Sequence, residues 1–227
     1  MKQANQAKLA TLAAALAMLA CAGAAHAQDS ARPAKGKPAA RAAAGATDAD
    51  MRKLIESSFS SKGPATVEGV LDRDAMQKAC SDYADRTKVP AAVAKKIEAA
   101  ELKQVKYPAD GQYLGDWKEG EKTAQNGRGM QFSDPVGGVN GANCYACHQM
   151  TKAEISFGNI GPSLYQYGKL RGNSEAVVRY TWGKIWDSSA YTACSNMPRF
   201  GHKGILTEQQ IRDVMALLLD PASPVNQ

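Results

Sequence analysis

The sequence predicts an all-α protein, and three observations support this fold class. Apolar residues recur at helical spacing in several segments, most clearly in the last one before the C terminus. Residues that favour helix starts and helix ends bracket these segments. No run of alternating apolar and polar residues has the length of a β-strand.

Residues 1–27 have the pattern of a secretory signal peptide. Lys2 and Lys8 flank the start of an apolar, alanine-rich run, and the small-x-small sequence AHA occupies 25–27. We therefore expect cleavage after Ala27 and export to the periplasm. Lipid attachment at Cys21 is the alternative, although the preceding MLA fits a lipoprotein signal poorly. No later segment predicts a membrane span.

Residues 28–46 are predicted to form a disordered linker. They are mostly Ala, Pro, Gly, Lys and Arg, and they cannot bury enough apolar surface to offset their conformational entropy. Without Lys2 and Lys8, 26 of the 28 basic residues remain against 22 acidic ones. A net charge of about +4 without a basic, aromatic-rich stripe does not indicate nucleic-acid binding.

Residues 47–110 are predicted to be a helical extension with two amphipathic segments. These segments contain few large apolar residues, so we expect them to pack on a larger domain rather than form their own core. The positions expected to face inward are Met76, Cys80 and Tyr83 in the first segment and Val93, Ile97 and Leu102 in the second.

Residues 111–227 are predicted to form the main domain, with helices at about 117–131, 174–186 and 207–219. Thr207 and Gln210 form a capping-box pair at the start of the last helix, and Asp220-Pro221 ends it. The residues expected to face inward are Val178, Trp182 and Ile185 in the middle helix and Ile211, Val214, Met215 and Leu218 in the last.

The stretch Cys144-Tyr-Ala-Cys147-His148 has the spacing of a c-type haem attachment site. Residues three apart on one helical turn lie on the same side, so both thiols can reach the vinyl groups of one porphyrin. The following imidazole is then placed to bind the iron from the proximal side. The sequence therefore predicts one covalent haem c.

The motif has two other interpretations. A redox-active Cys-x-x-Cys is expected at a helix start after a strand, and no strand is predicted before Cys144. A structural zinc needs four ligands, and Cys80 and Cys194 could supply the two that Cys144 and Cys147 do not.

The second axial ligand has few candidates, because His26 belongs to the signal peptide and leaves only His148 and His202. Met197 lies in the loop CSNMPRFG, about 50 residues after the motif, where Pro198 and Gly201 stiffen the backbone. A neutral thioether ligand raises the reduction potential of haem. We expect Met197 to be the ligand, with His202 as the second candidate or an exposed imidazole.

Further residues are expected around the haem. Metal-bound imidazoles usually donate their other N–H to a carbonyl, and the carbonyl of Pro162 is the candidate acceptor for His148. Arg199 is a candidate partner for a haem propionate. Trp182 and Trp186 are expected either at the haem edge or in the core.

The remaining cysteines of the mature chain, Cys80 and Cys194, are expected to form a disulfide. An even remainder of cysteines in an oxidising compartment favours such a bond. It would connect the helical extension to the loop that contains Met197.

Several stretches together resemble a known family. The haem motif, a Gly-Pro-x-Leu loop, a Met-Pro loop and a closing helix look like a class I cytochrome c domain. YPADGQYLGDWKEGEK, GANCYACHQ, GNIGPSLYQYG, NMPRFG and the tail LTEQQIRDVMALLLDPASPVN resemble the X subunits of SoxAX cytochromes, over about residues 107–226. Two features depart from class I domains: Leu217 replaces an aromatic, and Gly127 and Phe132 are out of the usual register.

This resemblance implies a function that composition and the spacing of the motif residues alone do not indicate. It implies a heterodimer with a SoxA-type cytochrome subunit, which couples thiosulfate oxidatively to a cysteine of the SoxYZ carrier. In that family catalysis is placed on the A subunit, and the X subunit passes electrons to a soluble cytochrome c. A free-standing cytochrome c shuttle is the alternative, and a peroxidase would need an open iron position.

Overall fold

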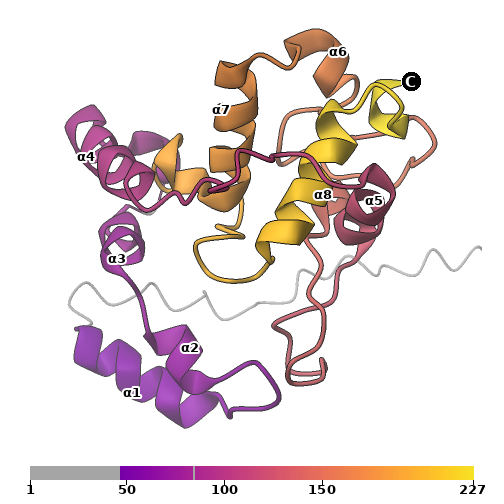
Figure 1. The fold of residues 1–227 in the computed structure, drawn as a ribbon. Coiled ribbons are helices and arrows are strands. Elements are labelled where there is room, and N and C mark those ends of the chain that lie inside the picture. The colour runs from indigo at the N-terminus through magenta and orange to yellow at the C-terminus, as the bar shows by residue number, and fades with distance from the viewer. Residues whose placement is uncertain (1–46, 84) are drawn as a thin grey trace, which may run out of the picture. The chain divides into compact units, whose positions relative to one another are not determined.

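The computed structural model describes residues 47–83 and 85–227, which are helical, as the sequence predicted (Figure 1). The expectations for the signal peptide, Cys21 and the linker fall on residues 1–46, outside the described residues. Thr47–Gln227 form one compact unit that includes both the extension and the main domain. The α-helices are α1 Asp48–Ser58, α2 Val67–Leu71, α3 Ala75–Ser81, α4 Ala91–Leu102, α5 Trp117–Gln125, α6 Tyr167–Arg171, α7 Glu175–Trp186 and α8 Glu208–Leu219.

Four short 3-10 helices complete the secondary structure of the described segments. They are η1 Arg86–Lys88, η2 Cys144–Ala146, η3 Ser188–Ala190 and η4 Pro224–Asn226. Within 47–83 and 85–227 the β-structure is limited to an isolated bridge between Lys62 and Ala65.

The main domain is built on the packing of α5 against α8, which lie side by side in Figure 1. Their backbones approach so closely at Gly120 that a Cβ on this residue would lie 2.1 Å from the carbonyl oxygen of Asp213. Only glycine fits there. The fully buried side chains of Trp182, Ile211, Met215 and Leu217 fill the core beside this contact.

Helix α8 confirms the sequence prediction in detail. The Oγ1 of Thr207 accepts the N–H of Gln210 at 3.2 Å, and the Gln210 side chain accepts the N–H of Thr207 at 3.0 Å. This capping box satisfies two amides that a helix start leaves without intrahelical partners. The four residues that were expected to face inward are all buried.

Helix α5 is shorter than the predicted 117–131 and ends at Gln125. Gly129 and Met130 have φ values of +122° and +65°, which an α-helix cannot contain. The close-approach glycine of α5 is therefore Gly120. Gly127, which the sequence places out of the register usual for class I domains, lies beyond the end of the helix.

The extension packs against the main domain through α3 and α4. Met76, Cys80, Ile97 and Cys194 form a small apolar cluster of their own. The prediction for Leu102 was wrong, because its side chain is 44% exposed and the neighbouring Glu101 is buried instead. The cause is a buried arginine from the main domain, Arg199, which binds the Glu101 carboxylate.

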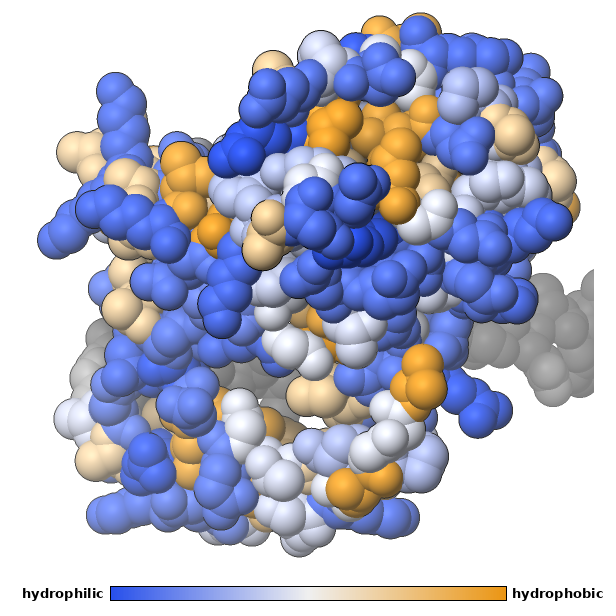
Figure 2. Space-filling model, in the orientation of Figure 1, coloured by the Kyte–Doolittle hydropathy of each residue, from blue (hydrophilic) through white to orange (hydrophobic). Residues whose placement is uncertain are grey.

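The face of the molecule drawn in Figure 2 is mostly hydrophilic, with separate hydrophobic groups. Apolar side chains that are strongly exposed include Val136, Val139, Ile155, Ile160 and Leu170. Over the described ranges, no helix has the length and the apolar content that a bilayer crossing requires.

Candidate haem site

A cavity of about 720 Å³ brings the predicted haem residues together. Cys144, Cys147 and His148 line it together with Met197, although about 50 residues separate Met197 from the motif. Pockets for small molecules and cofactors have volumes of roughly 300–1,000 Å³. The remaining wall is largely apolar and includes Met150, Leu164, Ile185, Phe200, Leu206, Val214 and Leu218.

A single tight turn, η2, arranges the motif. Asn143 before it has a left-handed backbone with φ of +46°. The backbone N–H groups of Cys147 and His148 then both donate to the carbonyl of Cys144, at 3.1 Å and 2.9 Å. This turn places both cysteines and the histidine at one cavity, as covalent haem attachment requires.

The imidazole of His148 is oriented by the loop at residues 158–164. Its Nδ1 lies 2.7 Å from the carbonyl oxygen of Pro162, the acceptor proposed from the sequence. With Nδ1–H donating there, Nε2 remains as the nitrogen with a free lone pair for iron. A Cβ on Gly161 would lie 2.1 Å from Cε1 of His148, so a glycine is required where the chain passes the ring.

This close contact gives a prediction for Gly161→Ala. The added methyl group has no space beside the His148 ring, so the ring or the loop must move and the bond to Pro162 is lost. We expect weaker iron ligation, visible as a changed Soret spectrum and a lower thermal midpoint of the holoprotein.

Gly127→Ala is the matched control for this variant. Its Cβ would meet only the Asn143 side-chain amide at 3.3 Å, which can rotate away. A Gly161→Ala spectrum identical to that of Gly127→Ala would contradict a role of this glycine in positioning His148.

The structure disfavours the zinc interpretation of the motif. Cys80 and Cys194 are joined in a disulfide, so neither thiol can bind zinc. Among the described residues, the one group of His, Cys, Asp and Glu with suitable spacing for a metal is Glu101, Asp187 and His202, away from the motif.

The thiol of Cys144 is also in the wrong environment for thiolate chemistry. Burial raises its pKa to about 12. Disulfide exchange needs the thiolate, and an apolar environment disfavours that charge. A thioether to haem is uncharged and is compatible with this burial. The residues present therefore fit a covalently bound haem.

Met197 is half-buried at the cavity wall and belongs to a loop with defined backbone contacts. Its carbonyl accepts the Oγ–H of Ser188 at 2.5 Å, and its N–H donates to Ser195 Oγ at 3.1 Å. Cys194 has φ of +58°, which turns the chain shortly before Met197. The loop is thus fixed on both sides of the thioether.

His202, the second candidate ligand, does not line the cavity. Its side chain is 22% exposed, not fully exposed as its alternative interpretation assumed, and Nδ1 lies 3.0 Å from Asp187 Oδ2. Burial, with a contribution from the Arg199 charge, lowers the pKa of His202. The imidazole belongs to a buried polar cluster rather than to the haem site.

The structure places Arg199 away from the cavity, which differs from the expectation that it would bind a propionate. Its guanidinium pairs with Glu101 at 2.9 Å and with Asp74. Trp182 and Trp186 are likewise outside the cavity wall; Trp182 is fully buried and donates to the Lys106 carbonyl at 2.8 Å.

Other cations line the cavity, and sequence reasoning missed them. They are Arg86, Arg171 and Lys184. Arg86 belongs to η1 of the extension and donates to the Oδ1 of Asn196, next to Met197, at 2.7 Å. No local signal marks Arg86, because it comes close to the motif only through the packing of the extension. These cations are candidate propionate partners.

Comparison with known proteins agrees with this site. Residues 138–220, which include the motif, the Pro162 loop and Met197, match the family model "Cytochrome c". The chain is 39% identical over 157 residues to a protein of Aquifex aeolicus (strain VF5) described as an uncharacterized lipoprotein, an alignment that covers 68% of this chain and 73% of the relative.

Most of the cavity wall lies within the range that the family model matches. A cytochrome c domain implies covalently bound haem c and electron transfer. The all-α protein described here contains a cytochrome c domain, which the family model matches over residues 138–220.

Proposed function

We propose that this chain is the monohaem electron-transfer subunit of a periplasmic SoxAX-type complex that oxidises thiosulfate. The observation that carries the electron-transfer role is that His148 and Met197 line one cavity from distant parts of the sequence. A haem held by a donor on each side has no open iron position for a substrate. Electron transfer is therefore favoured over peroxidase chemistry.

The residues of this chain have distinct roles in that function. Haem supplies one-electron redox chemistry when it is bound. Cys144 and Cys147 hold it covalently, and Pro162 orients His148 through the 2.7 Å contact at Nδ1. The neutral thioether of Met197 favours the reduced state and raises the potential. The apolar cavity wall limits access of water to the cofactor.

The assignment to thiosulfate oxidation is supported by the resemblance of residues 107–226 to X subunits. In that reaction a carrier thiol and thiosulfate form a sulfur–sulfur bond, with release of one proton and two electrons. A single haem takes one electron at a time, so this subunit would pass electrons twice to a soluble cytochrome c. The bond-forming step is placed on the A subunit.

Export is part of the proposal, because cytochrome c domains are typically found outside the cytoplasm. The sequence places the cleavage site after Ala27. The relative described as a lipoprotein favours the alternative, a lipid on Cys21. The intact mass of the native protein separates these two forms, since one begins at Gln28 and the other carries acyl chains.

Isolation with its partner tests this function. The chain is coexpressed with a SoxA-type subunit and the haem-attachment machinery, and the complex is analysed for haem content and thiosulfate-dependent reduction with SoxYZ. We expect a stoichiometric complex in which thiosulfate reduces the haem of this chain.

A matched control is the double variant Cys144→Ala/Cys147→Ala, which removes covalent haem from this chain alone. It should assemble yet lose electron flow to cytochrome c. A chain that stays monomeric beside SoxA and adds nothing to turnover would support the free-standing shuttle instead. A colourless protein would refute the haem assignment.

A further inference from the structure

The loop that carries Met197 is held by the N-terminal extension as well as by the main domain, where Ser188 binds the Met197 carbonyl and the Trp186 carbonyl accepts the N–H groups of Gly201 and His202. We define the methionine loop as residues 191–206, between η3 and α8. Contacts from the extension reach it on both sides of Met197. The residues of the loop involved are Ala193, Cys194 and Asn196 before Met197, and Arg199 and Lys203 after it.

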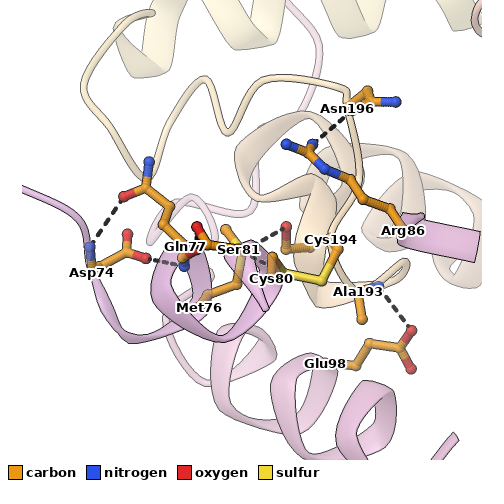
Figure 3. Close-up of a disulfide and its surroundings, with 11 residues drawn as sticks. Asp74, Met76, Gln77, Cys80, Ser81, Arg86, Glu98, Ala193, Cys194 and Asn196 are labelled. Carbon is orange, nitrogen blue, oxygen red and sulfur yellow. Dashed lines mark hydrogen bonds between the residues drawn. A yellow bond between two sulfur atoms is a disulfide. The ribbon is translucent and has the colours of Figure 1, made fainter. Parts of the chain in front are cut away.

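On the N-terminal side of Met197, three contacts come from separate parts of the extension (Figure 3). Cys80 of α3 forms the disulfide with Cys194. The Arg86 guanidinium donates to Asn196 Oδ1 at 2.7 Å, and Glu98 of α4 accepts the backbone N–H of Ala193 at 3.0 Å. In Figure 1, α4 lies beside η3, where this loop begins.

On the C-terminal side, the contact is a buried ion cluster. The Arg199 side chain is only 5% exposed and pairs with the Asp74 and Glu101 carboxylates of the extension. Lys203 Nζ also lies 2.9 Å from Asp74. Burial opposes ionisation of Asp74, but hydrogen bonds from Arg199, Gln77 and Lys203 hold its pKa well below the usual range.

A buried guanidinium is stable only while its partners neutralise it. Arg199 lies two residues after Met197, with the rigid Pro198 between them. An Arg199 side chain that loses its partners must move toward water, and the backbone at Met197 moves with it. The ion cluster therefore restricts the thioether as well as stabilising the fold.

We propose that the extension is a clamp that positions Met197 at the haem iron, with Asp74, Glu101 and Glu98 as positioning residues that act through the methionine loop. This inference rests on the proposed ligation by Met197. It gives the extension a role inside this chain, in addition to any contact with a partner. Loosening the clamp is expected to let the thioether leave the iron more often.

The test compares ferric holoproteins of the full chain. Asp74→Asn/Glu101→Gln removes the two carboxylates of the extension that pair with Arg199 and retains their shapes, while Asp187 of the main domain, 3.9 Å from the guanidinium, is left in place. We expect weakening of the red-region iron–methionine absorption band and an increase of about tenfold or more in imidazole affinity, because truncating buried charge pairs costs several times the free energy of a tenfold change. Imidazole competes only for iron that the thioether has released.

Glu98→Ala is a second variant in case the double variant does not fold. It removes one acceptor for a loop amide at a half-buried site, and we expect a smaller shift in the same direction. Asp110→Asn is the matched control. It breaks the ion pair of the extension with Arg212 on α8, with N–O distances of 2.9 Å, and does not contact the methionine loop.

The outcomes separate the clamp from the ligation itself. The clamp is supported if the first two variants change the band and the imidazole affinity and Asp110→Asn does not. It is refuted if folded variants lose stability but keep both at wild-type values, or if all three shift equally. A wild-type band that is absent, or that survives in Met197→Ala, refutes the proposed ligation, and the clamp with it.

Discussion

Replacing Met197 by alanine is expected to lower the reduction potential of the holoprotein, by on the order of 0.1–0.3 V out of the roughly 0.8 V range that haem axial ligands span. The thioether is neutral and soft and stabilises ferrous iron relative to ferric iron. Alanine leaves water or hydroxide as the alternative ligand, which favours the ferric state. Potentiometric titration of the two proteins measures the shift directly.

The same substitution should remove the red-region iron–methionine band and allow imidazole or cyanide to bind without competition. Met150→Leu is the matched control, because Met150 lines the same cavity but is fully buried and lies next to the motif. Met150→Leu should retain the iron–methionine band and have a reduction potential close to that of the wild-type protein. An unchanged band in Met197→Ala would exclude Met197 as the ligand.

The comparison of Met197→Ala with the wild-type protein also decides between electron transfer and peroxidase activity as the function of this domain. A permanent thioether closes the iron to peroxide, so the wild-type protein is expected to lack peroxidase activity, whereas Met197→Ala gains an open position. The cavity already contains the cations Arg86, Arg171 and Lys184. Burial lowers the pKa of Lys184.

The features that sequence predicted well are those with local causes. The capping box and the apolar stripe of α8 involve residues within one helix, so their pattern is visible without knowledge of the fold. The turn of the haem motif is also local, because Cys144 accepts from residues three and four positions later. His148 and Pro162 are only 14 residues apart in the sequence. Their contact follows from the general preference of metal-bound imidazoles to donate the other ring N–H to a carbonyl.

The predictions that differed from the structure depend on distant partners. Leu102 is the better apolar candidate by sequence, yet Glu101 is buried because Arg199, 98 residues later, binds its carboxylate. The same pairing explains why Arg199 is not at the cavity. A buried ion pair can be recognised only once the fold shows that the two charged residues are neighbours, because each charged residue alone predicts a solvated side chain.

The disulfide, which the structure shows, and the proposed ligation by Met197 belong between these two groups. Each joins remote segments, but scarce residue types narrow the choice. After residue 27, two cysteines lie outside the haem motif, and His202 is the one histidine besides His148, which leaves a methionine as the main alternative for the second axial ligand. Cys80 and Cys194 were the two cysteines outside the haem motif, and the structure confirms their bond. Scarcity thus substitutes for the missing spatial information.

Removal of the Cys80–Cys194 disulfide is expected to have the largest effect on stability. The bond closes a loop with a sequence separation of 114 residues. In the chain-entropy account, such a crosslink stabilises by up to roughly 4–5 kcal/mol, because it restricts the unfolded chain. For a domain of this size that corresponds to a fall in thermal midpoint of on the order of 10 °C for Cys80→Ala/Cys194→Ala.

Urea unfolding distinguishes this entropic cause from a local packing defect. Without the crosslink the unfolded chain is more expanded, so the dependence of unfolding free energy on urea should become steeper while the midpoint falls. Loss of packing at the two buried sites alone would lower the midpoint and leave the slope unchanged. The single variant Cys80→Ala already breaks the bond and should therefore reproduce the steeper slope. If its slope matches that of the intact protein, the stabilisation comes from contacts around α3 and the methionine loop rather than from the closed loop.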